Sequence, residues 1–353
     1  MDTTPTLPTL GAGLPVALGE IDHQIKQLWE QSGNVATRAS LMNLAVYCEG
    51  EEAMRLNTAR IGRISQDHPC RGILIGVEPG EGESQVEAWI GAHCHLTRAG
   101  AKQTCCEQIT FRLTGPESHS LIPSIVFSHL DSDLPLYLWW QGEFPRPLNR
   151  QLWTWVDRII FDSSQWRDQC AQLELLRESL NLSGMKSRII LCDLNWARSL
   201  YFRQAVSSTF DHPGLLPFLE KLDRVQITHA PGCRSTALLF LGWLASRLEW
   251  PAAANGDGFL REDGTRLETE IIEAAGAPLG VCELTAGNAR FRFYREADSA
   301  FIHSEVDDGS GHQTQRLFPA GRDTLDDLVD EELSRGGRHR VYLQALSVAE
   351  TLF

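Results

Sequence analysis

The sequence predicts an N-terminal α/β domain with a largely parallel sheet, followed by a C-terminal α+β domain with an antiparallel sheet. In the first half, short apolar strand patterns alternate with helical patterns, which is typical of a parallel sheet. In the second half, several strand patterns follow one another and two helical patterns end the chain. With 353 residues, of which 42% are hydrophobic and 22% charged, the chain is large enough to form two cores.

Residues 1–33 are predicted to form an N-terminal arm and a first helix. Residues 1–19 are rich in proline, glycine and threonine, which favours an extended or flexible segment. Apolar residues at helical spacing then predict a helix from Ile21 to Trp29. A second helical pattern runs from Arg38 to Ile64, so we expect one long helix there.

The remaining first-half patterns define a domain over residues 34–183. Helices are expected at 121–127, despite Pro123, and at 165–180. Residues 181–186 (NLSGMK) are a plausible break between the two halves. The predicted strands are 72–77, 86–93, 108–113, 134–140 and 158–161.

Residues 184–353 form the predicted C-terminal domain. Asp193 is a candidate cap for a helix over 194–210, and a second, apolar helix is expected over 235–250. Thr285–Asn288 suits a hairpin loop. The other predicted elements are strands at 224–229, 266–272, 280–284, 290–295 and 300–306, and helices at 324–334 and 340–352.

Charge and composition exclude several classes of protein. The formal net charge of −14 disfavours binding to nucleic acid or to an anionic membrane surface. No apolar run reaches the length of a membrane span, and no secretory pattern opens the chain, so we expect a cytoplasmic protein. Nine scattered cysteines without a CxxC motif are expected to be mostly buried, reduced thiols.

The common catalytic motifs are missing from the sequence. There is no GxSxG, no GxxxxGK[ST] and no GxGxxG after a predicted strand. The glycine-rich segment Gly76–Gly82 contains acids that repel phosphate, so it is interpreted as a hairpin loop. We therefore expect no cofactor and no dinucleotide site, despite the α/β first half.

One cluster has the composition of a metal site. His93 and His95 would point to the same face of a strand, and Cys105 could supply a thiolate to the same ion. The alternative is that the histidines form hydrogen bonds and the cysteines pack in the core. We favour packing, and we expect no metal.

Two aromatic clusters remain. Trp139 and Trp140 end an apolar strand, where sites form in open α/β sheets, although a core tryptophan pair is the commoner arrangement. Tryptophan and arginine dominate protein interfaces. The second cluster is Asn195, Trp196, Arg198 and Arg203. These residues either bind a partner or pack within the protein.

Seven segments in one order resemble the glucose-6-phosphate dehydrogenase assembly protein family, OpcA. They are 38–44 (RASLMNL), 68–71 (HPCR), 92–96 (AHCHL), 105–109 (CCEQI), 133–140 (DLPLYLWW), 157–163 (DRIIFDS) and 193–198 (DLNWAR) with Arg203 and Phe210-Asp211. The similarity extends to 241–245 (LGWLA) and is weak beyond it. It implies a non-catalytic partner of glucose-6-phosphate dehydrogenase, in some members under redox control through cysteines.

The function hypothesis is therefore an allosteric activator that binds glucose-6-phosphate dehydrogenase and favours its active oligomer in the pentose phosphate pathway. The alternative is a sugar-phosphate-binding protein or enzyme with a pocket near Trp139 and Trp140. If redox control exists, Cys233 beside Gly232 is the first candidate thiol. The sequence leaves the docking face, the stoichiometry and self-association open.

Overall fold

The structure is a computed structural model of the whole chain, and it describes residues 13–32, 36–96, 103–182, 189–253, 258–261, 263–335 and 340–353. Its contacts divide the chain into two compact units. The first unit contains residues 1–161 and 172–191, and the second contains residues 162–171 and 192–353. The predicted break at 181–186 falls mostly outside the described residues, and the predicted domain boundaries stay a prediction.

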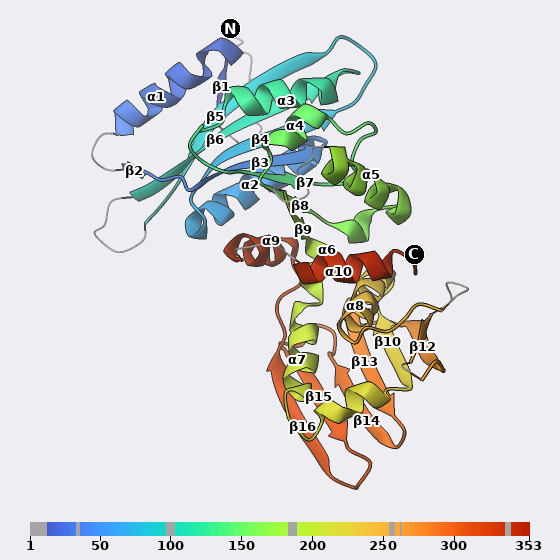
Figure 1. Cartoon of the computed structure of the whole chain (residues 1–353). Coiled ribbons are helices and arrows are strands. Elements are labelled where there is room, and N and C mark those ends of the chain that lie inside the picture. Colours follow the sequence, from blue (N-terminus) through green and yellow to red (C-terminus); the bar gives the residue numbers. More distant parts are fainter. Residues whose placement is uncertain are drawn as a thin grey trace. The chain divides into compact units, whose positions relative to one another are not determined.

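The first unit is built on one largely parallel sheet, as predicted (Figure 1). Its strand order is β1-β5-β6-β4-β3-β7-β8-β9, with β2 paired to β6. Strands β3, β4, β6, β7 and β8 run parallel, whereas β1 and β5 are antiparallel to their neighbours. The strands are β1 Leu14–Val16, β2 Ala36–Arg38, β3 Met42–Glu49, β4 Cys70–Glu78, β5 Gln85–Leu96, β6 Gln103–Thr114, β7 Leu136–Trp140, β8 Arg158–Phe161 and β9 Ile190–Asp193.

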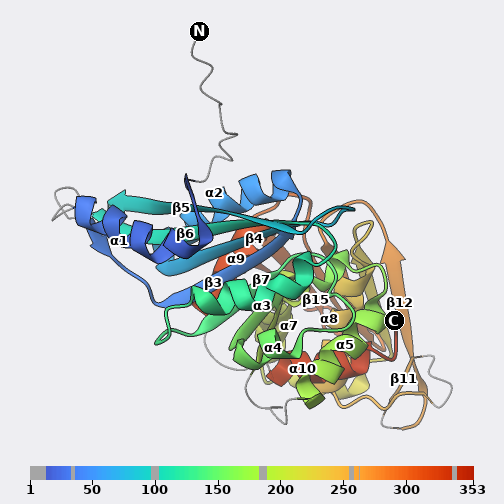
Figure 2. The same ribbon diagram turned by 90° about the horizontal axis from the view of Figure 1, so that it is seen from above.

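Helices cover both faces of this sheet, as Figure 2 shows for α2 and α3. Gly72 and Gly76 of β4 face α2, where Ile61 and Met54 pack against them. Phe111, on the opposite side of the pleat, stacks at 5.3 Å on His129, which directly follows α3. The helical segments before β9 are η1 Leu18–Glu20, α1 Ile21–Ser32, α2 Glu51–Asp67, α3 Ser118–Ser128, α4 Arg150–Trp155, η3 Ser163–Gln165 and α5 Gln169–Leu182.

The predicted helix over Arg38–Ile64 is wrong in its first half. Met42–Glu49 is a strand in the middle of the sheet, paired with β4 and β7, and the helix α2 begins only at Glu51. A strand buried on both faces has a continuous apolar run, which periodicity cannot distinguish from one side of a helix. The neighbouring strands, which the local pattern does not contain, decide the conformation.

The second unit contains a seven-stranded, mostly antiparallel sheet, as predicted. Its order is β11-β12-β10-β13-β14-β15-β16, and only the β10–β12 pair is parallel. The sequence missed the edge strand β16, because its polar residues lack a strand pattern. The strands are β10 Arg224–His229, β11 Phe259–Leu260, β12 Arg266–Glu273, β13 Leu279–Ala286, β14 Ala289–Tyr294, β15 Phe301–Asp307 and β16 Gln313–Pro319.

Helices α7 and α8 pack on one face of this sheet (Figure 1). Phe210 of α7 lies 4.8 Å from Phe291 of β14, ring to ring. Every residue of α8 from Ser235 to Ala245 is buried, because α10 packs on the side away from the sheet. These helical segments are α6 Leu194–Arg198, α7 Leu200–Phe210, η4 Leu216–Lys221, α8 Arg234–Arg247, α9 Leu325–Ser334 and α10 Arg340–Ala349. None of the helices described here is long and apolar enough to span a membrane.

The crossing of α8 and α10 depends on Gly242. A Cβ atom at this position would lie 2.5 Å from the carbonyl oxygen of Ala345. We expect Gly242→Ala to lower the free energy of unfolding by about 1 to 3 kcal/mol, since the clash outweighs the better helix propensity of alanine. Urea unfolding of the purified chain measures this loss.

Gly80→Ala is the matched control, because Gly80 is exposed and a Cβ there would meet no atom within 4 Å. Equal unfolding free energies for the two variants would show that the helices can separate without cost at Gly242.

Candidate functional site

The DLNWAR segment is organised around the carboxylate of Asp193, which is 1% exposed. Asp193 caps α6 by accepting a hydrogen bond of 3.0 Å from the backbone N–H of Asn195. It also accepts hydrogen bonds from the backbone and hydroxyl of Ser163, at 3.0 and 2.7 Å, and from the hydroxyl of Tyr342 at 3.1 Å. Burial raises the pKa of Asp193 to about 6, while the donors from Ser163 and Asn195 act to lower it.

Asn195 extends this network to α8. Its amide nitrogen donates to the hydroxyls of Ser163 and Ser235, at 3.0 Å each, and its oxygen accepts a hydrogen bond from Thr236. Asn195 itself is fully buried. The two side chains of Asp193 and Asn195 therefore join four segments of the second unit: η3, α6, α8 and α10.

The arginines of this segment have partners inside the second unit. Arg198 forms a bidentate ion pair with Asp162, with N···O distances of 2.7 and 2.6 Å. Arg203 donates to the carbonyl oxygen of Trp196 at 2.8 Å, and its guanidinium lies 3.3 Å from the centre of the Trp196 ring. Trp196 and Arg203 are only 4% and 8% exposed.

Most residues of the predicted partner-binding set are buried and make contacts within the protein. Asn195, Trp196 and Arg203 are buried, and Trp139 and Trp140 in the first unit are 1% and 3% exposed. Side chains this deeply buried offer almost no surface to a partner in this conformation. Their contacts hold the fold together, and binding of a partner by these residues stays a prediction.

The carboxyl ends of β3 and β7 mark the point in the first unit where the strand order changes direction. Open α/β sheets bind their ligands in the crevice at such a point. Here, Tyr47 of β3 and Trp140 of β7 stack on each other with ring centres 3.7 Å apart. Beside them, the side-chain amides of Asn57 and Gln141 form a reciprocal pair of hydrogen bonds at 2.9 and 2.8 Å. Side chains of the protein itself therefore fill this crevice.

Acidic residues stand where a dinucleotide site needs donors. Glu49, Glu51 and Glu52 surround the junction of β3 and α2, and two of them occupy the first helical turn. A helix N-terminus attracts phosphate through its free N–H groups, and carboxylates at the same place repel it. The hydroxyl of Tyr47 donates to Glu49 at 2.8 Å and contacts Nε2 of His119 at 2.8 Å. This geometry agrees with the missing glycine motif.

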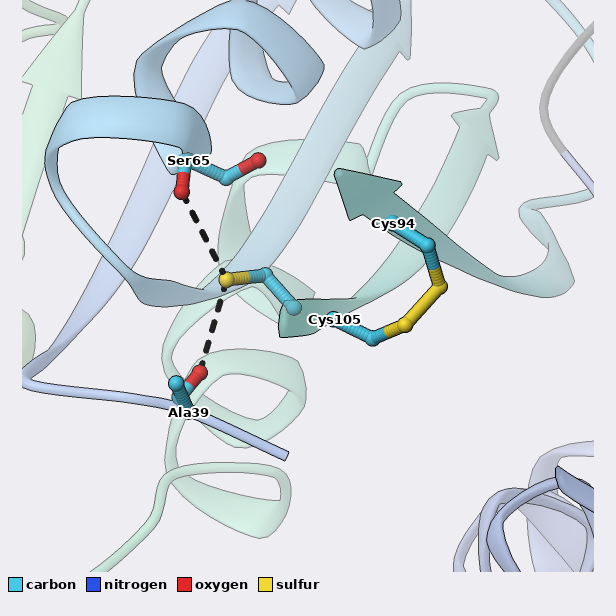
Figure 3. Close-up of a disulfide and its surroundings, with 5 residues drawn as sticks. Ala39, Ser65, Cys94 and Cys105 are labelled. Carbon is cyan, nitrogen blue, oxygen red and sulfur yellow. Dashed lines mark hydrogen bonds between the residues drawn. A yellow bond between two sulfur atoms is a disulfide. The ribbon is translucent and has the colours of Figure 1, made fainter. Parts of the chain in front are cut away.

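The structure contains a disulfide that the sequence analysis did not predict. Cys94 of β5 and Cys105 of β6 are direct partners across the antiparallel pair, with Cα atoms 4.1 Å apart (Figure 3). Cys94 is exposed and Cys105 is fully buried. The signal in the sequence was that Cys94 directly follows the predicted strand 86–93 and Cys105 shortly precedes the predicted strand 108–113. Nine scattered cysteines without a CxxC motif predict mostly reduced thiols, because the pairing of Cys94 with Cys105 depends on strand register.

The same region does not assemble the proposed metal site. Cys105 is bonded to Cys94, so its thiolate is not available to an ion. His93 makes a hydrogen bond of 2.7 Å to Gln108 through Nε2, and its ring lies against Gly62. No cluster of metal-binding side chains occurs among the residues that the structure describes.

The remaining cysteines are free thiols. Cys106 follows Cys105 on β6, so it points to the opposite face of the strand, and its sulfur contacts the carbonyl oxygens of Ala39 and Ser65. Cys233 is half-buried just before α8, and burial raises the pKa of its thiol although Arg198 acts to lower it. A raised pKa disfavours the reactive thiolate, so its redox role stays a prediction.

The outer face of the second sheet, opposite α7 and α8, carries a row of apolar and aromatic side chains. These residues are register partners across six strands: Ile272, Thr228, Val281, Tyr294, His303 and Leu317. Tyr294 and His303 stack with ring centres 4.8 Å apart, and Leu317 is 60% exposed. Phe301, next to the row on β15, is 50% exposed.

A row of charges borders these residues on the same face. Arg292 pairs with Glu305 at 3.3 Å and lies near Glu283 at 4.0 Å, and its guanidinium is 4.5 Å from the centre of the Tyr294 ring. We call the apolar row, Phe301 and these charges the outer sheet surface. Exposed apolar groups beside arginine and tyrosine are typical of protein interfaces.

The fold and these sites define a class: a two-unit protein with a largely parallel and a mostly antiparallel sheet, in which side chains of the protein occupy the edge of the first sheet at β3 and β7. Residues 62–178 match the family model of the glucose-6-phosphate dehydrogenase subunit N-terminal domain. Residues 190–346 match the model of the C-terminal domain of the same subunit. The chain belongs to the OpcA family, which is linked to glucose-6-phosphate dehydrogenase assembly.

Relatives from cyanobacteria have the same family name. The chain is 29% identical over 311 residues to the OxPP cycle protein OpcA of Synechococcus elongatus, covering 81% of this chain and 68% of the relative. It is 26% identical over 330 residues to OpcA of Nostoc punctiforme, covering 82% of this chain and 66% of the relative. The chain thus spans about two thirds of the length of these relatives.

Solved structures with distant similarity are oxidoreductases. An aldose-aldose oxidoreductase from Caulobacter crescentus has a TM-score of 0.45 and 10% identity, with 88% of this chain and 95% of that chain covered. A glucose-6-phosphate 1-dehydrogenase from Mycobacterium avium also has a TM-score of 0.45, at 11% identity, with 88% and 90% covered. Similarity at this level carries no information about activity.

The raised pKa of Asp193 predicts how stability depends on pH. Its unfolded-state pKa lies near 3.8, so between pH 4 and 6 the folded state binds more protons than the unfolded state. The contribution of Asp193 to stability therefore increases as the pH falls from 7 to 4. Relative to Asp193→Asn, we expect the unmodified chain to gain about 2 to 3 kcal/mol over this range.

The measurement is urea unfolding of both chains at pH 7, 6, 5 and 4. Because both chains share all other titrating groups, their difference isolates the carboxylate. A constant difference across the pH series would mean that Asp193 keeps an ordinary pKa in the fold.

The disulfide predicts a second change in stability. Cys94→Ser removes the link between β5 and β6. The unfolded chain then gains conformational entropy, which should lower the free energy of unfolding by about 2 to 3 kcal/mol. Cys170→Ser is the matched control, since Cys170 is exposed and free. Unfolding without reductant should separate the two variants, and added dithiothreitol should bring the unmodified chain to the level of Cys94→Ser. Identical unfolding curves for all three proteins without reductant would contradict the disulfide.

Proposed function

We propose that this chain is a non-catalytic factor that binds glucose-6-phosphate dehydrogenase and favours its active oligomeric form. Matches to the two domains of the glucose-6-phosphate dehydrogenase subunit over both halves of the chain support this role. The names of the relatives, which refer to the OxPP cycle, support it as well.

The filled crevice of the first unit is the single observation that carries the non-catalytic part. A dehydrogenase needs a nicotinamide cofactor at the carboxyl edge of the sheet. Tyr47 and Trp140 occupy this space, and the adjacent turn has a single glycine, Gly50, between carboxylates that repel a pyrophosphate. A fold can host many functions, so the site decides, and this site does not fit a dinucleotide.

Binding can act on the enzyme by shifting its conformational equilibrium. A partner that binds the active oligomer more tightly than the inactive form increases the population of the active oligomer. The shift cannot exceed the difference between the two binding free energies. This mechanism needs no chemical step on the chain itself. The sequence likewise contains none of the common motifs that supply a catalytic nucleophile.

The outer sheet surface is the contact that we propose for the dehydrogenase. It combines exposed Phe301 and Leu317 with the Arg292–Tyr294 pair. Arginine and tyrosine are among the residue types that dominate binding energy at interfaces. The side chains first suspected, from Asn195 to Arg203, then act indirectly by keeping the second unit folded.

The experiment mixes the chain with glucose-6-phosphate dehydrogenase from the same organism. We expect the chain alone to show no turnover with glucose 6-phosphate and NADP⁺. Added to the enzyme, it should raise kcat or lower KM, and sedimentation should show a shift of the enzyme toward its larger oligomer. An unchanged rate, KM and oligomer distribution at saturating chain would overturn the assembly role.

Phe301→Ser and Leu317→Ser test the contact surface. Each should weaken binding by about 2 kcal/mol, roughly 30-fold in Kd, with little change in melting temperature, because both side chains are half-exposed or more. Leu216→Ser is the matched control, as Leu216 is 55% exposed in η4. Activation with wild-type affinity by both surface variants would move the contact elsewhere while leaving the assembly role in place.

A further inference from the structure

An open pocket lies beside the filled crevice of the first unit. It has a volume of about 560 Å³ and lies between the start of α3 and the segment that leads from β7 into α4. Its walls include Ile122, Trp140, Pro145 and Leu148. Binding sites for small molecules commonly have volumes of this size.

The position of the pocket is the one where this type of sheet binds ligands. The pocket opens next to Trp140, the last residue of β7, at the carboxyl edge of the parallel strands. The Tyr47–Trp140 stack lies on the same face of the sheet as α3, because the hydroxyl of Tyr47 contacts Nε2 of His119 at 2.8 Å. Trp140 forms one wall of the pocket, which lies beside the stack, between the start of α3 and α4.

The polar groups of this pocket are those that recognise a phosphate ester. Arg146 and Arg150 line the pocket and are exposed, in a chain whose net charge is −14. Guanidinium groups match the oxygen geometry of phosphate. Ser120 and Asn149 also line it, and Asn149 caps α4 through its side-chain oxygen, so its amide nitrogen is not used by the cap.

We propose that this pocket binds a phosphorylated monosaccharide, with the phosphate at Arg146 and Arg150. The amide nitrogen of Asn149 donates to the sugar hydroxyls, and the Ser120 oxygen, whose own proton goes to the carbonyl oxygen of Glu117 at 2.7 Å, accepts from them. The proline and leucine walls contact the C–H face of the sugar. A nucleotide fits less well, because a base stacks on a free aromatic face. The indoles of Trp140 and Trp153 are only 3% and 5% exposed.

This site gives the chain a role beyond contact with an enzyme, since it makes the chain a receptor for a metabolite. It does not depend on the proposed assembly function, because binding is a property of the chain alone. It also assigns no reaction to the pocket, so the non-catalytic proposal is unaffected.

Titration of the full chain tests the site, with heat of binding as the readout. The probes are glucose 6-phosphate, glucose, inorganic phosphate and AMP. We expect saturable binding of glucose 6-phosphate that is at least about tenfold tighter than binding of glucose or of inorganic phosphate. The reason is that the pocket contacts both the sugar and the phosphate of this ligand.

Substitution of the pocket arginines separates this site from any other. Arg146→Gln with Arg150→Gln should weaken glucose 6-phosphate binding at least about tenfold, the size expected for lost charge-assisted hydrogen bonds. Arg322→Gln, an exposed arginine in the second unit, is the matched control and should bind as the unmodified chain does. Melting temperatures of all variants confirm that folding is unchanged.

Three results would overturn the proposal. They are no saturable binding of glucose 6-phosphate at millimolar concentration, binding that survives loss of both arginines, and AMP binding tighter than glucose 6-phosphate binding. The first two remove the site, and the third replaces the ligand class with a nucleotide. None of them bears on activation of the dehydrogenase, which is measured separately.

Discussion

The second unit depends on one buried carboxylate. Asp193 loses its hydration on folding, which is costly unless hydrogen-bond donors replace the water. Ser163, Asn195 and Tyr342 supply those donors, and they belong to η3, α6 and α10. Since Asn195 also binds Ser235 and Thr236 of α8, the packing of four segments is fixed by two polar side chains, Asp193 and Asn195. The apolar contacts of α8 and α10 supply stability, and this network supplies their register.

In the first unit, the side chains at the edge of the sheet decide what that edge can bind. The parallel strands, the change in strand order and the helix after β3 together form the frame in which dinucleotides bind. The stack of Tyr47 on Trp140 and the carboxylates at α2 make that frame unsuitable for a pyrophosphate. The open pocket next to the stack uses the same edge of the sheet for a smaller, anionic molecule. Fold and function are separate questions here, and side chains answer the second.

The two proposed surfaces divide the roles between the units. The outer sheet surface is broad, with an apolar row bordered by paired charges, which suits another protein. The pocket of the first unit is concave and has arginines at its rim, which suits a small phosphate ester. In an assembly factor with both surfaces, binding of the metabolite and binding of the enzyme are coupled if each changes the affinity for the other. The concentration of the metabolite then affects activation of the enzyme.

The sequence by itself determined the fold class of both units, most strands and helices, the cap at Asp193 and the family. These depend on local periodicity, turn residues and motif order, which act over a few residues. It did not determine that 42–49 is a central strand, because the neighbours β4 and β7 come from distant segments. Tertiary structure alone decided that Arg203 is buried, that Cys94 meets Cys105, and that one register row of the second sheet is apolar. Burial, pairing and register are set by contacts between remote parts of the chain, and no local pattern contains them.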